Sequence, residues 1–421
     1  MAEASSHIYK GEKKVLFFLH KFPFPATDGT KARIADAVIA PMLEHSQCEA
    51  LVVTWEQPPN VPLDRQLIPT TGFILSRWQL LWNFLRRLWS KRPWQVEMLY
   101  DEAVEQEFRM RIAQVDVVYV QSLRLGRYVE SLSPPDRAKV LLDLNDAISR
   151  HYLSGWHRYP LLWRLGVLIE GLKYRWYEKR MLRQFKWTTI IADSDKAYLQ
   201  SFLTEPSTHI EVVYSSAKPV IPCRVEAGVD GPPSMYFLAN VRYYPNREGL
   251  EHFLRRIWPC IKRELPDAVL YVIGKGTEKL ARQYAREKGL IWTGYLSTEQ
   301  LAEVVAKARI CVSPVRIGAG MQTKIVEALM SGKPVVAAAE VTQWALYLPQ
   351  LVGLFRCHHN DPEEWAYTIA WLIEHYEEER AKLCDERTQA LLRDLFDVEN
   401  VARRYQRVIS RMLSCCQEGM R

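Results

Sequence analysis

Short, uninterrupted apolar runs recur along the first half of the chain, separated mostly by polar segments with helical periodicity. The first run, residues 14–19, ends just before Pro23 and Pro25, which is typical of a parallel strand buried on both faces. The same pattern predicts strands at residues 50–54, 115–120, 140–142, 188–192 and 210–214. Strands that alternate with helices in this way indicate an α/β fold with a doubly wound sheet.

A Pro/Gly-rich stretch interrupts this pattern after the sixth predicted strand, as expected for a domain linker. A second α/β series follows it, with predicted strands at residues 235–239, 268–273, 291–292, 310–313 and 334–338. We therefore expect two doubly wound, Rossmann-like domains that face a cleft. The expected limits are residues 1–215 for the N-terminal domain, 216–234 for the linker, 235–390 for the C-terminal domain and 391–421 for a C-terminal helix. Whether that helix packs back on the N-terminal domain stays open.

Bulk composition adds limits on the function and the location. The 421 residues exceed what one hydrophobic core usually organises, which agrees with two domains. A net charge of +7 is too small for this length to argue nucleic-acid binding, and we expect none. The eight cysteines show neither a CxxC pair nor zinc spacing, so we expect reduced thiols in a cytoplasmic protein. No apolar run is long enough for a signal peptide or a transmembrane helix.

The segment 310–330 has the order strand, glycine turn and helix, which is typical of anion-binding sites. Gly318 and Gly320 let the backbone approach a phosphate, and the helix predicted from Thr323 points unpaired N–H groups at it. Lys324 and Glu327, three residues apart, share one face of this helix, so they could hold a phosphate and ribose hydroxyls. A plain turn followed by a solvated Lys/Glu pair is the alternative.

The motif around these residues resembles a known family. Gly318-x-Gly320-x3-Lys324-x2-Glu327-Ala328-x3-Gly332-Lys333-Pro334-Val335-Val336 is similar to the donor-site block of the retaining GT-B glycosyltransferases of group 1, family 4. Three further segments agree in order: Pro23-x-Pro25-x3-Gly29-x3-Arg33, Asn246 with Gly274-Lys275-Gly276, and Thr293-Gly294-Tyr295. The resemblance spans most of the chain.

The resemblance implies a sugar-nucleotide donor, with UDP-, GDP- or another NDP-sugar as substrate, and neither a metal nor another cofactor. Glu327 would hold the ribose, backbone groups beside Tyr295 the base, and Gly274 and Gly276 would border the phosphates. The donor-binding residues that we predict are Gly29, Asn246, Gly274, Gly276, Tyr295, Arg316, Gly318, Gly320, Thr323, Lys324 and Glu327.

Some positions depart from the family pattern. A glutamate common in relatives is Ala319 here, and the usual arginine and lysine after the first strand of the domain are replaced by Asn240 and Asn246. Lys324, Arg242 and Arg316 then remain as phosphate-neutralising side chains. These changes indicate either a subtype, which we favour, or a loss of activity.

In the N-terminal domain, Asn145 and Asp146 follow a predicted strand, where many relatives place a histidine near Asn145. We predict that both are catalytic, with Asp146 acting on the acceptor or orienting the sugar. A strand-end aspartate is also a common helix N-cap. For Asp193 and Asp195, capping is the favoured interpretation.

The segment 77–92 combines three tryptophans and five positive charges with no acid. This composition suits a helix lying on anionic lipid, and 174–187 is a second basic stretch. Contact with the inner face of the membrane is thus one hypothesis. A helix packed on the domain with a solvated basic face is the other.

We therefore predict sugar transfer from a nucleoside-diphosphate sugar to a hydroxyl acceptor: a glycan, a lipid-linked glycan or a small molecule. Retention at the anomeric carbon rests on the resemblance alone. A non-catalytic nucleotide-binding or scaffold protein of the same fold and a sugar-nucleotide epimerase are the alternatives.

Overall fold

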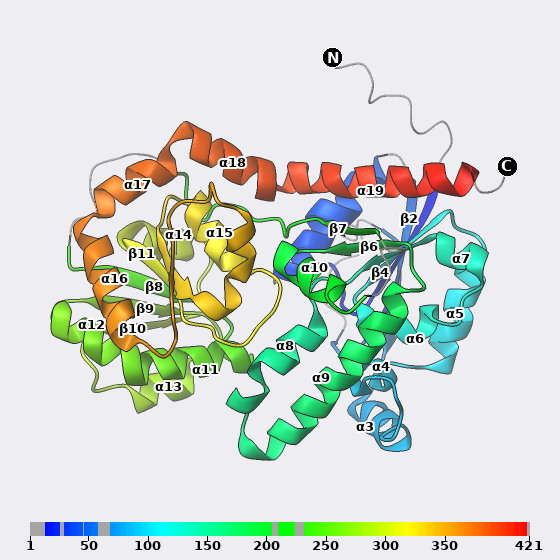
Figure 1. Ribbon diagram of the computed structural model, residues 1–421, viewed down its shortest axis with the longest axis horizontal. Coiled ribbons are helices and arrows are strands. Elements are labelled where there is room, and N and C mark those ends of the chain that lie inside the picture. Colours follow the sequence, from blue (N-terminus) through cyan, green and yellow to red (C-terminus); the bar gives the residue numbers. More distant parts are fainter. Residues whose placement is uncertain are drawn as a thin grey trace. The chain divides into compact units, whose positions relative to one another are not determined.

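The computed structural model describes residues 13–25, 29–44, 46–57, 68–203, 209–223 and 231–418. The chain divides into two compact units, which are described separately (Figure 1). Unit 1 comprises Met1–Ser216 and Val398–Arg421, and unit 2 comprises Ala217–Asp397. The last helix therefore belongs to the same unit as the N-terminal half of the chain.

Unit 1 is built on a seven-stranded parallel sheet with the order β3-β2-β1-β4-β5-β6-β7. Its strands are β1 (Lys13–Leu19), β2 (Ser46–Thr54), β3 (Thr70–Ile74), β4 (Val117–Gln121), β5 (Val140–Asp143), β6 (Trp187–Ile190) and β7 (His209–Val212). The apolar runs predicted all of these except β3. That strand lies at the sheet edge and is at most half-buried, so it lacks a continuous apolar run.

Helices cover both faces of this sheet, because successive side chains of a strand point to opposite sides. In β1, Leu16 and Phe18 join one buried cluster, whereas Val15 and Phe17 join another. The helices of unit 1 are α1 (Gly29–Ala32), the π-helical η1 (Arg33–Ile39), α2 (Ala40–Leu43), α3 (Arg77–Arg86), α4 (Trp94–Met98), α5 (Glu102–Ile112), α6 (Gly126–Val129), α7 (Pro134–Ala138), α8 (Ile148–Gly155), α9 (Leu161–Leu182), α10 (Asp193–Gln200) and α19 (Val398–Glu418).

The C-terminal helix α19 packs on η1 and α2 in unit 1, the arrangement that the sequence left open. Val401, Tyr405 and Ile409 lie on one face of α19 at helical spacing, and all three are buried with Val15 and Phe17 of the sheet. This apolar stripe fixes the helix to unit 1.

Unit 2 has a six-stranded parallel sheet with the order β10-β9-β8-β11-β12-β13. Its strands are β8 (Ser234–Leu238), β9 (Val269–Ile273), β10 (Leu290–Gly294), β11 (Ile310–Ser313), β12 (Val335–Ala338) and β13 (Leu354–Cys357). Its helices are α11 (Tyr244–His252), the π-helical η5 (Phe253–Ile257), α12 (Trp258–Glu264), α13 (Glu278–Gln283), α14 (Thr298–Lys307), α15 (Thr323–Met330), α16 (Pro362–Glu374), α17 (Tyr376–Cys384) and α18 (Glu386–Phe396). Two parallel α/β sheets confirm the predicted fold class. Only the partly exposed edge strand β13 was not predicted.

Two cysteines form a disulfide, which corrects the expectation of eight reduced thiols. Cys223 is bonded to Cys384 at the end of α17, across a sequence separation of 161 residues. Both sulfur atoms pack against Gly332, where a Cβ atom would lie 2.6 and 2.7 Å from them. Gly332 also has a φ of +68°. A glycine is therefore favoured here for two reasons: it adopts this backbone conformation readily, and it leaves space for the two sulfur atoms. In the described part of the chain, no helix combines the length and apolarity needed to cross a bilayer.

Candidate active site

The strand order of unit 2 marks one place on its sheet as a binding site. The chain winds outward from β8 to β9 and β10 on one side, and β11 to β13 lie on the other. In doubly wound sheets, ligands bind at the carboxyl ends of the strands where the order reverses. The segments that follow β8 and β11, residues 239–243 and 314–322, therefore flank the expected site.

The segment after β9 packs directly against the one after β8. The Val241 N–H donates to the Lys275 carbonyl at 2.8 Å, and the Gly274 N–H donates to the Gly294 carbonyl at 2.7 Å. Gly274 has a φ of +130°, and a Cβ atom there would lie 1.9 Å from the Ala239 oxygen. Only glycine permits this close approach.

The N-terminus of α15 is open to an anion. Its N-cap residue, Gln322, makes no side-chain capping bond, because the Gln322 amide oxygen accepts instead from the Ser313 hydroxyl at 2.6 Å. The Ile325 N–H donates to the Gln322 carbonyl at 3.0 Å, so the N–H groups of Thr323 and Lys324 and the positive end of the helix dipole are left for a ligand. Thr323 is the first residue of the helix, and Gly320, with a φ of +69°, lies in the turn before it.

The side chain of Lys324 is held in place by Asn246, a position where the sequence departs from the family pattern. The Lys324 ammonium donates to Asn246 Oδ1 at 3.3 Å and lies 5.0 Å from the centre of the Phe237 ring. Asn246 in turn donates from Nδ2 to the Asn240 carbonyl at 3.0 Å. Burial lowers the pKa of Lys324 to about 8, so the group is still mainly a cation at neutral pH. Asn246 therefore orients this cation, which an arginine or lysine there would repel.

Glu327 lies one turn deeper in the helix. Its side chain is half-buried, and no described residue gives its carboxylate a hydrogen bond or an ion pair. Burial raises the pKa of Glu327 to about 7, although the Lys324 charge opposes the shift. A half-buried carboxylate without a partner is costly in a folded protein, which indicates a group kept for a ligand.

The other cations near this site differ in whether a carboxylate already neutralises their charge. Arg316 forms a two-point ion pair with Glu248, with Nε 3.2 Å from Oε2, so its charge is already neutralised. The Arg242 guanidinium has no ion-pair partner among the described residues and is exposed. Lys275, which the sequence motif contained but which we did not single out, lies 4.4 Å from the centre of the exposed Tyr295 ring. Lys324 and Arg242 are thus better placed than Arg316 to meet a phosphate.

Unit 1 has its own reversal of strand order, between β1 and β4. His20 follows β1 and is buried, with no partner for Nδ1 among the described residues. Arg124 lies in the short 3-10 helix η3 (Leu123–Leu125) after β4. Burial, and then the Arg124 charge, lower the pKa of His20 well below its ordinary value, and that of His151 to about 4. Burial raises the pKa of Asp146, whereas Arg124 acts against that shift. The charge of Arg124 therefore lowers the pKa of both histidines and opposes the rise in the pKa of Asp146.

Asp146 does not cap the helix that follows it. Ala147 is the N-cap residue of α8, and its N–H donates to Asp195 Oδ2 at 3.0 Å. Asp195 also pairs with Arg150 at 2.6 Å, so this aspartate, and not Asp146, supports the start of α8. The capping alternative for Asp146 is thereby removed.

Asn145 belongs to a buried polar network below Asp146. It has a φ of +66°, and its Oδ1 accepts from Arg33 NH2 at 3.1 Å. Arg33 NH1 lies 2.8 Å from Asp143 Oδ2, and both side chains are fully buried. Burial alone would lower the pKa of Arg33, but the Asp143 carboxylate outweighs it and raises the pKa well above the ordinary value. The network fixes Asn145, which suits a positioning role better than proton transfer.

The structure thus distributes the predicted site residues over both units. Unit 2 contains Asn246, Gly274, Gly276, Tyr295, Arg316, Gly318, Gly320, Thr323, Lys324 and Glu327, and unit 1 contains Gly29, Asn145 and Asp146. Gly29 begins α1, and the three residues before it, 26–28, lie outside the described residues. The roles assigned to these residues stay predictions.

His20, Arg124, His151 and Lys275 were not predicted. His20 directly follows an apolar run, and Arg124 comes three residues after the end of the next strand in the sheet, so the strand-end rule would have marked both. In the described part of the chain, no group of three or more His, Cys, Asp or Glu side chains is placed to hold a metal ion.

The sequence and the fold of the chain are similar to those of known glycosyltransferases. A family model described as "Glycosyl transferases group 1" matches residues 232–375, which contain all the residues of unit 2 that we predict to bind the donor. Sucrose-phosphate synthase from Thermosynechococcus elongatus matches with a TM-score of 0.69 at 14% identity, over 96% of this chain and 100% of that chain. HepE from Anabaena, solved with UDP and glucose, gives a TM-score of 0.62 at 17% identity, over 95% and 100%.

The lipopolysaccharide outer core galactosyltransferase WaaB matches with a TM-score of 0.58 at 13% identity, over 94% of this chain and 99% of that chain. None of the curated proteins compared by sequence matches the chain. The family match and the fold confirm the resemblance. Residues 232–375 therefore match the group 1 glycosyltransferase domain, and the two α/β units have the GT-B fold of the structures compared.

Proposed function

We propose that the chain transfers a sugar, with retention at the anomeric carbon, from a UDP-sugar to a hydroxyl of a glycan or lipid-linked glycan. The observation that carries the proposal is the unpartnered, half-buried Glu327 carboxylate one turn below the uncapped N-terminus of α15. Ribose hydroxyls donate to such a carboxylate, and the diphosphate accepts from the helix N–H groups. UDP is favoured because the similar fold of HepE was solved with UDP-glucose, although GDP or another base stays open.

Each group then has a task in the reaction. The bond between the anomeric carbon and the diphosphate breaks, and the acceptor oxygen forms the new bond on the same face of the sugar. Lys324 and the α15 terminus stabilise the negative charge that builds up on the leaving diphosphate. Asp146, whose pKa burial raises, orients the acceptor hydroxyl by accepting its hydrogen bond. The hydroxyl proton leaves with the diphosphate.

A nucleotide-release assay tests this function. The chain would be given UDP- and GDP-sugars in turn, with glycan and lipid-linked acceptors, and the anomeric configuration of the product read by NMR. Release that depends on an acceptor, with the donor's configuration kept, is the expected result. Inversion would refute retention. Tight nucleotide binding without release would favour the non-catalytic alternative, and a changed sugar stereocentre would favour the epimerase.

Nucleotide affinity is expected to depend on pH with a maximum between about 7 and 8. The pKa of Glu327 is raised to about 7, so below that pH the carboxyl is protonated and accepts ribose hydroxyls less well. The pKa of Lys324 is lowered to about 8, so above that pH its charge is lost and phosphate binding weakens. Isothermal titration with UDP from pH 5.5 to 9 measures both limbs.

The variant Glu327→Gln is the control for this profile. This variant lacks the titrating carboxyl. Its UDP affinity should therefore no longer fall between about pH 7 and the pH at which UDP itself titrates, whereas the fall in affinity above about pH 8 should remain. An acid limb that is unchanged in Glu327→Gln would show that another group causes it.

A further inference from the structure

Helix α3 carries four of its large apolar side chains on the outside of unit 1. Trp78, Leu81, Trp82 and Leu85 have the spacing i, i+3, i+4 and i+7, so they share one helical face. All four are exposed, Trp78 by 80%, and Trp89 just beyond the helix is exposed by 93%. No side chain of α3 is fully buried.

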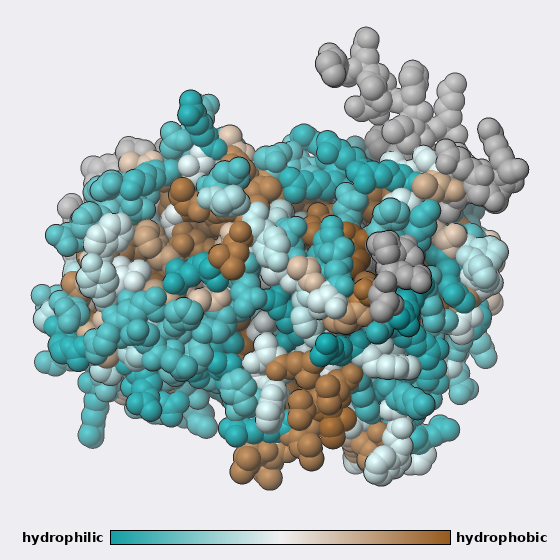
Figure 2. Space-filling view, in the orientation of Figure 1, coloured by the Kyte–Doolittle hydropathy of each residue, from teal (hydrophilic) through white to brown (hydrophobic). Residues whose placement is uncertain are grey.

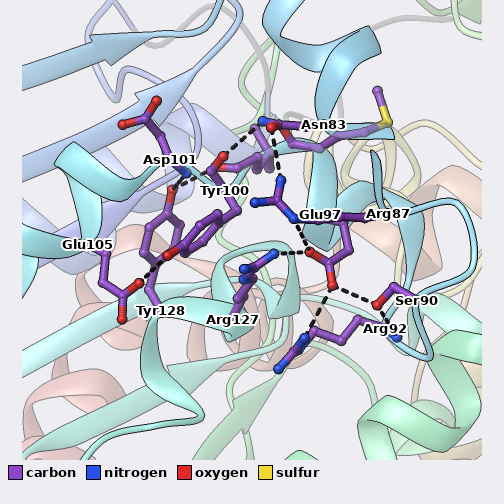
Figure 3. A network of polar contacts seen from close by, with 12 residues as sticks. Asn83, Arg87, Ser90, Arg92, Glu97, Tyr100, Asp101, Glu105, Arg127 and Tyr128 are labelled. Carbon is purple, nitrogen blue, oxygen red and sulfur yellow. Dashed lines mark hydrogen bonds and ion pairs between the residues drawn. The ribbon is translucent and has the colours of Figure 1, made fainter. Parts of the chain in front are cut away.

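Polar contacts on the opposite face hold α3 in this orientation (Figure 3). Asn83 Nδ2 donates to the carbonyls of Met98 and Tyr100 at 3.1 and 2.9 Å. Arg87 Nε lies 3.4 Å from Oε2 of Glu97, a buried carboxylate that also pairs with Arg92 and Arg127. Leu80 and Phe84 also pack inward, on the core and on the Trp94 ring. The inner face of the helix is thus mixed, and its purely apolar face is turned outward.

Helix α9 also exposes apolar side chains. The inner face of its C-terminal half packs on the core through Tyr174, Tyr177, Met181 and Leu182, whereas its first turn and outer stripe expose apolar residues, with Leu162 exposed by 94%. The exposed apolar side chains of α9 are Leu161, Leu162, Trp163, Leu165, Leu172 and Trp176. In Figure 2, hydrophobic side chains gather over the free end of α9 and beside it over α3.

The two helices form one surface because the segment after α3 packs on α9. Glu170 accepts from the N–H groups of Trp94 and Gln95 at 2.8 and 3.0 Å, and Lys173 donates to the Leu88 carbonyl at 3.4 Å. Lys173 also lies 4.5 Å from the centre of the Trp94 ring. We call the exposed apolar side chains of α3, Trp89 and α9 the apolar surface.

The exposed charges of the two segments that contain the apolar surface are all positive. Arg87 and Arg92 are paired with the buried Glu97, and Arg150 is paired with the buried Asp195. Residues 77–96 contain five lysines and arginines and no acid. Residues 147–192 contain nine more, and their two acids, Glu170 and Glu178, are both buried. Exposed Arg77 and Lys91 have no partner in the described part of the chain. Tryptophans and leucines that project from a cationic rim without any carboxylate match the interface of an anionic lipid bilayer.

We propose that the apolar surface docks unit 1 on an anionic lipid bilayer, with the tryptophans and leucines at the level of the headgroups and the cations facing the lipid phosphates. This docking is independent of the proposed sugar transfer, because it requires no catalytic activity. A second copy of the chain is a less suitable occupant, because pairing two such surfaces would bring like charges together.

Vesicle flotation of the full chain tests this proposal. Binding is expected to phosphatidylcholine vesicles that contain phosphatidylglycerol, to fall at high salt, and to be weak on phosphatidylcholine alone. Two triple variants, Trp78→Ser/Trp82→Ser/Trp89→Ser and Leu161→Ser/Leu162→Ser/Trp163→Ser, should each weaken binding at least about tenfold, because each removes several large apolar groups. As a matched control, Leu346→Ser/Tyr367→Ser removes equally exposed side chains from unit 2 and should bind as the parent does.

Three results would overturn the proposal: no binding by the parent chain, equal binding by the triple variants, or equal binding to both kinds of vesicle. Sedimentation without vesicles gives a fourth test. A dimer that the same substitutions dissociate would show that the surface pairs two copies. Circular dichroism and UDP binding, which depends on unit 2, check that the variants are folded.

Discussion

Replacing Lys324 by alanine is expected to lower turnover by about 100- to 1,000-fold, the usual cost of removing one group that stabilises charge in a transition state. The reason is its place at the start of α15, where the ammonium is held by Asn246 Oδ1 at 3.3 Å beside uncapped helix N–H groups. Its charge acts most strongly on the leaving diphosphate, so kcat should fall more than the affinity for the donor. Steady-state nucleotide release at saturating donor measures this.

Lys279→Ala is the matched control for this experiment. Lys279 is an exposed lysine of α13 in the same unit and has no partner in the described part of the chain. Turnover of this variant should equal that of the parent chain. If Lys324→Ala kept full turnover while its circular dichroism and melting curve matched the parent, the proposed role of Lys324 would be wrong.

Replacing Asp143 by alanine is expected to lower the free energy of unfolding of unit 1 by about 3–5 kcal/mol, as found when one partner of a buried ion pair is removed. The side chains of Asp143 and Arg33 are both fully buried and lie 2.8 Å apart. Tyr119, Thr189 and the Asn145 N–H also donate to this carboxylate, so the substitution leaves an unpaired cation and three unsatisfied donors. Hydrogen exchange of the β5 amides during denaturation reports the loss.

Two further variants identify the cause of that loss. Asp116→Ala removes a partly exposed pair with Lys13, at 3.5 Å, and should cost less than about 1 kcal/mol. The double variant Arg33→Met/Asp143→Leu removes both buried charges and should recover part of the stability. A loss of less than about 1 kcal/mol in Asp143→Ala would mean that the pair does not support unit 1.

Much of the fold could be predicted because buried parallel strands are continuous apolar runs. Eleven of the 13 strands among the described residues follow from such runs, and the helix predicted at 323–330 matches α15 residue for residue. The edge strands β3 and β13 could not be predicted in this way, since one side of an edge strand needs no apolar partner. The disulfide was missed because Cys223 and Cys384 are 161 residues apart, and sequence spacing alone carries no information about such a pair.

Of the candidate site, only the part that lies within one short segment of the chain could be predicted. The glycine turn, Lys324 and Glu327 lie within ten residues, so helical periodicity relates them directly. The support of Lys324 by Asn246 crosses 78 residues, and the ion pair of Arg316 with Glu248 crosses 68. Such contacts depend on the packing of α11 against the turn after β11. Sequence reasoning therefore listed Arg316 as an available cation and Asn246 as a departure from the family pattern.

Titration of UDP into the parent chain and into Glu327→Ala tests the central claim, that the start of α15 with Glu327 binds the donor nucleotide. Loss of the hydrogen bonds to this carboxylate should cost about 1–3 kcal/mol, a rise in Kd of about 5- to 150-fold. Glu303→Ala, which removes an exposed glutamate of α14, should leave Kd unchanged. Equal affinity of the parent and a folded Glu327→Ala would contradict the claim.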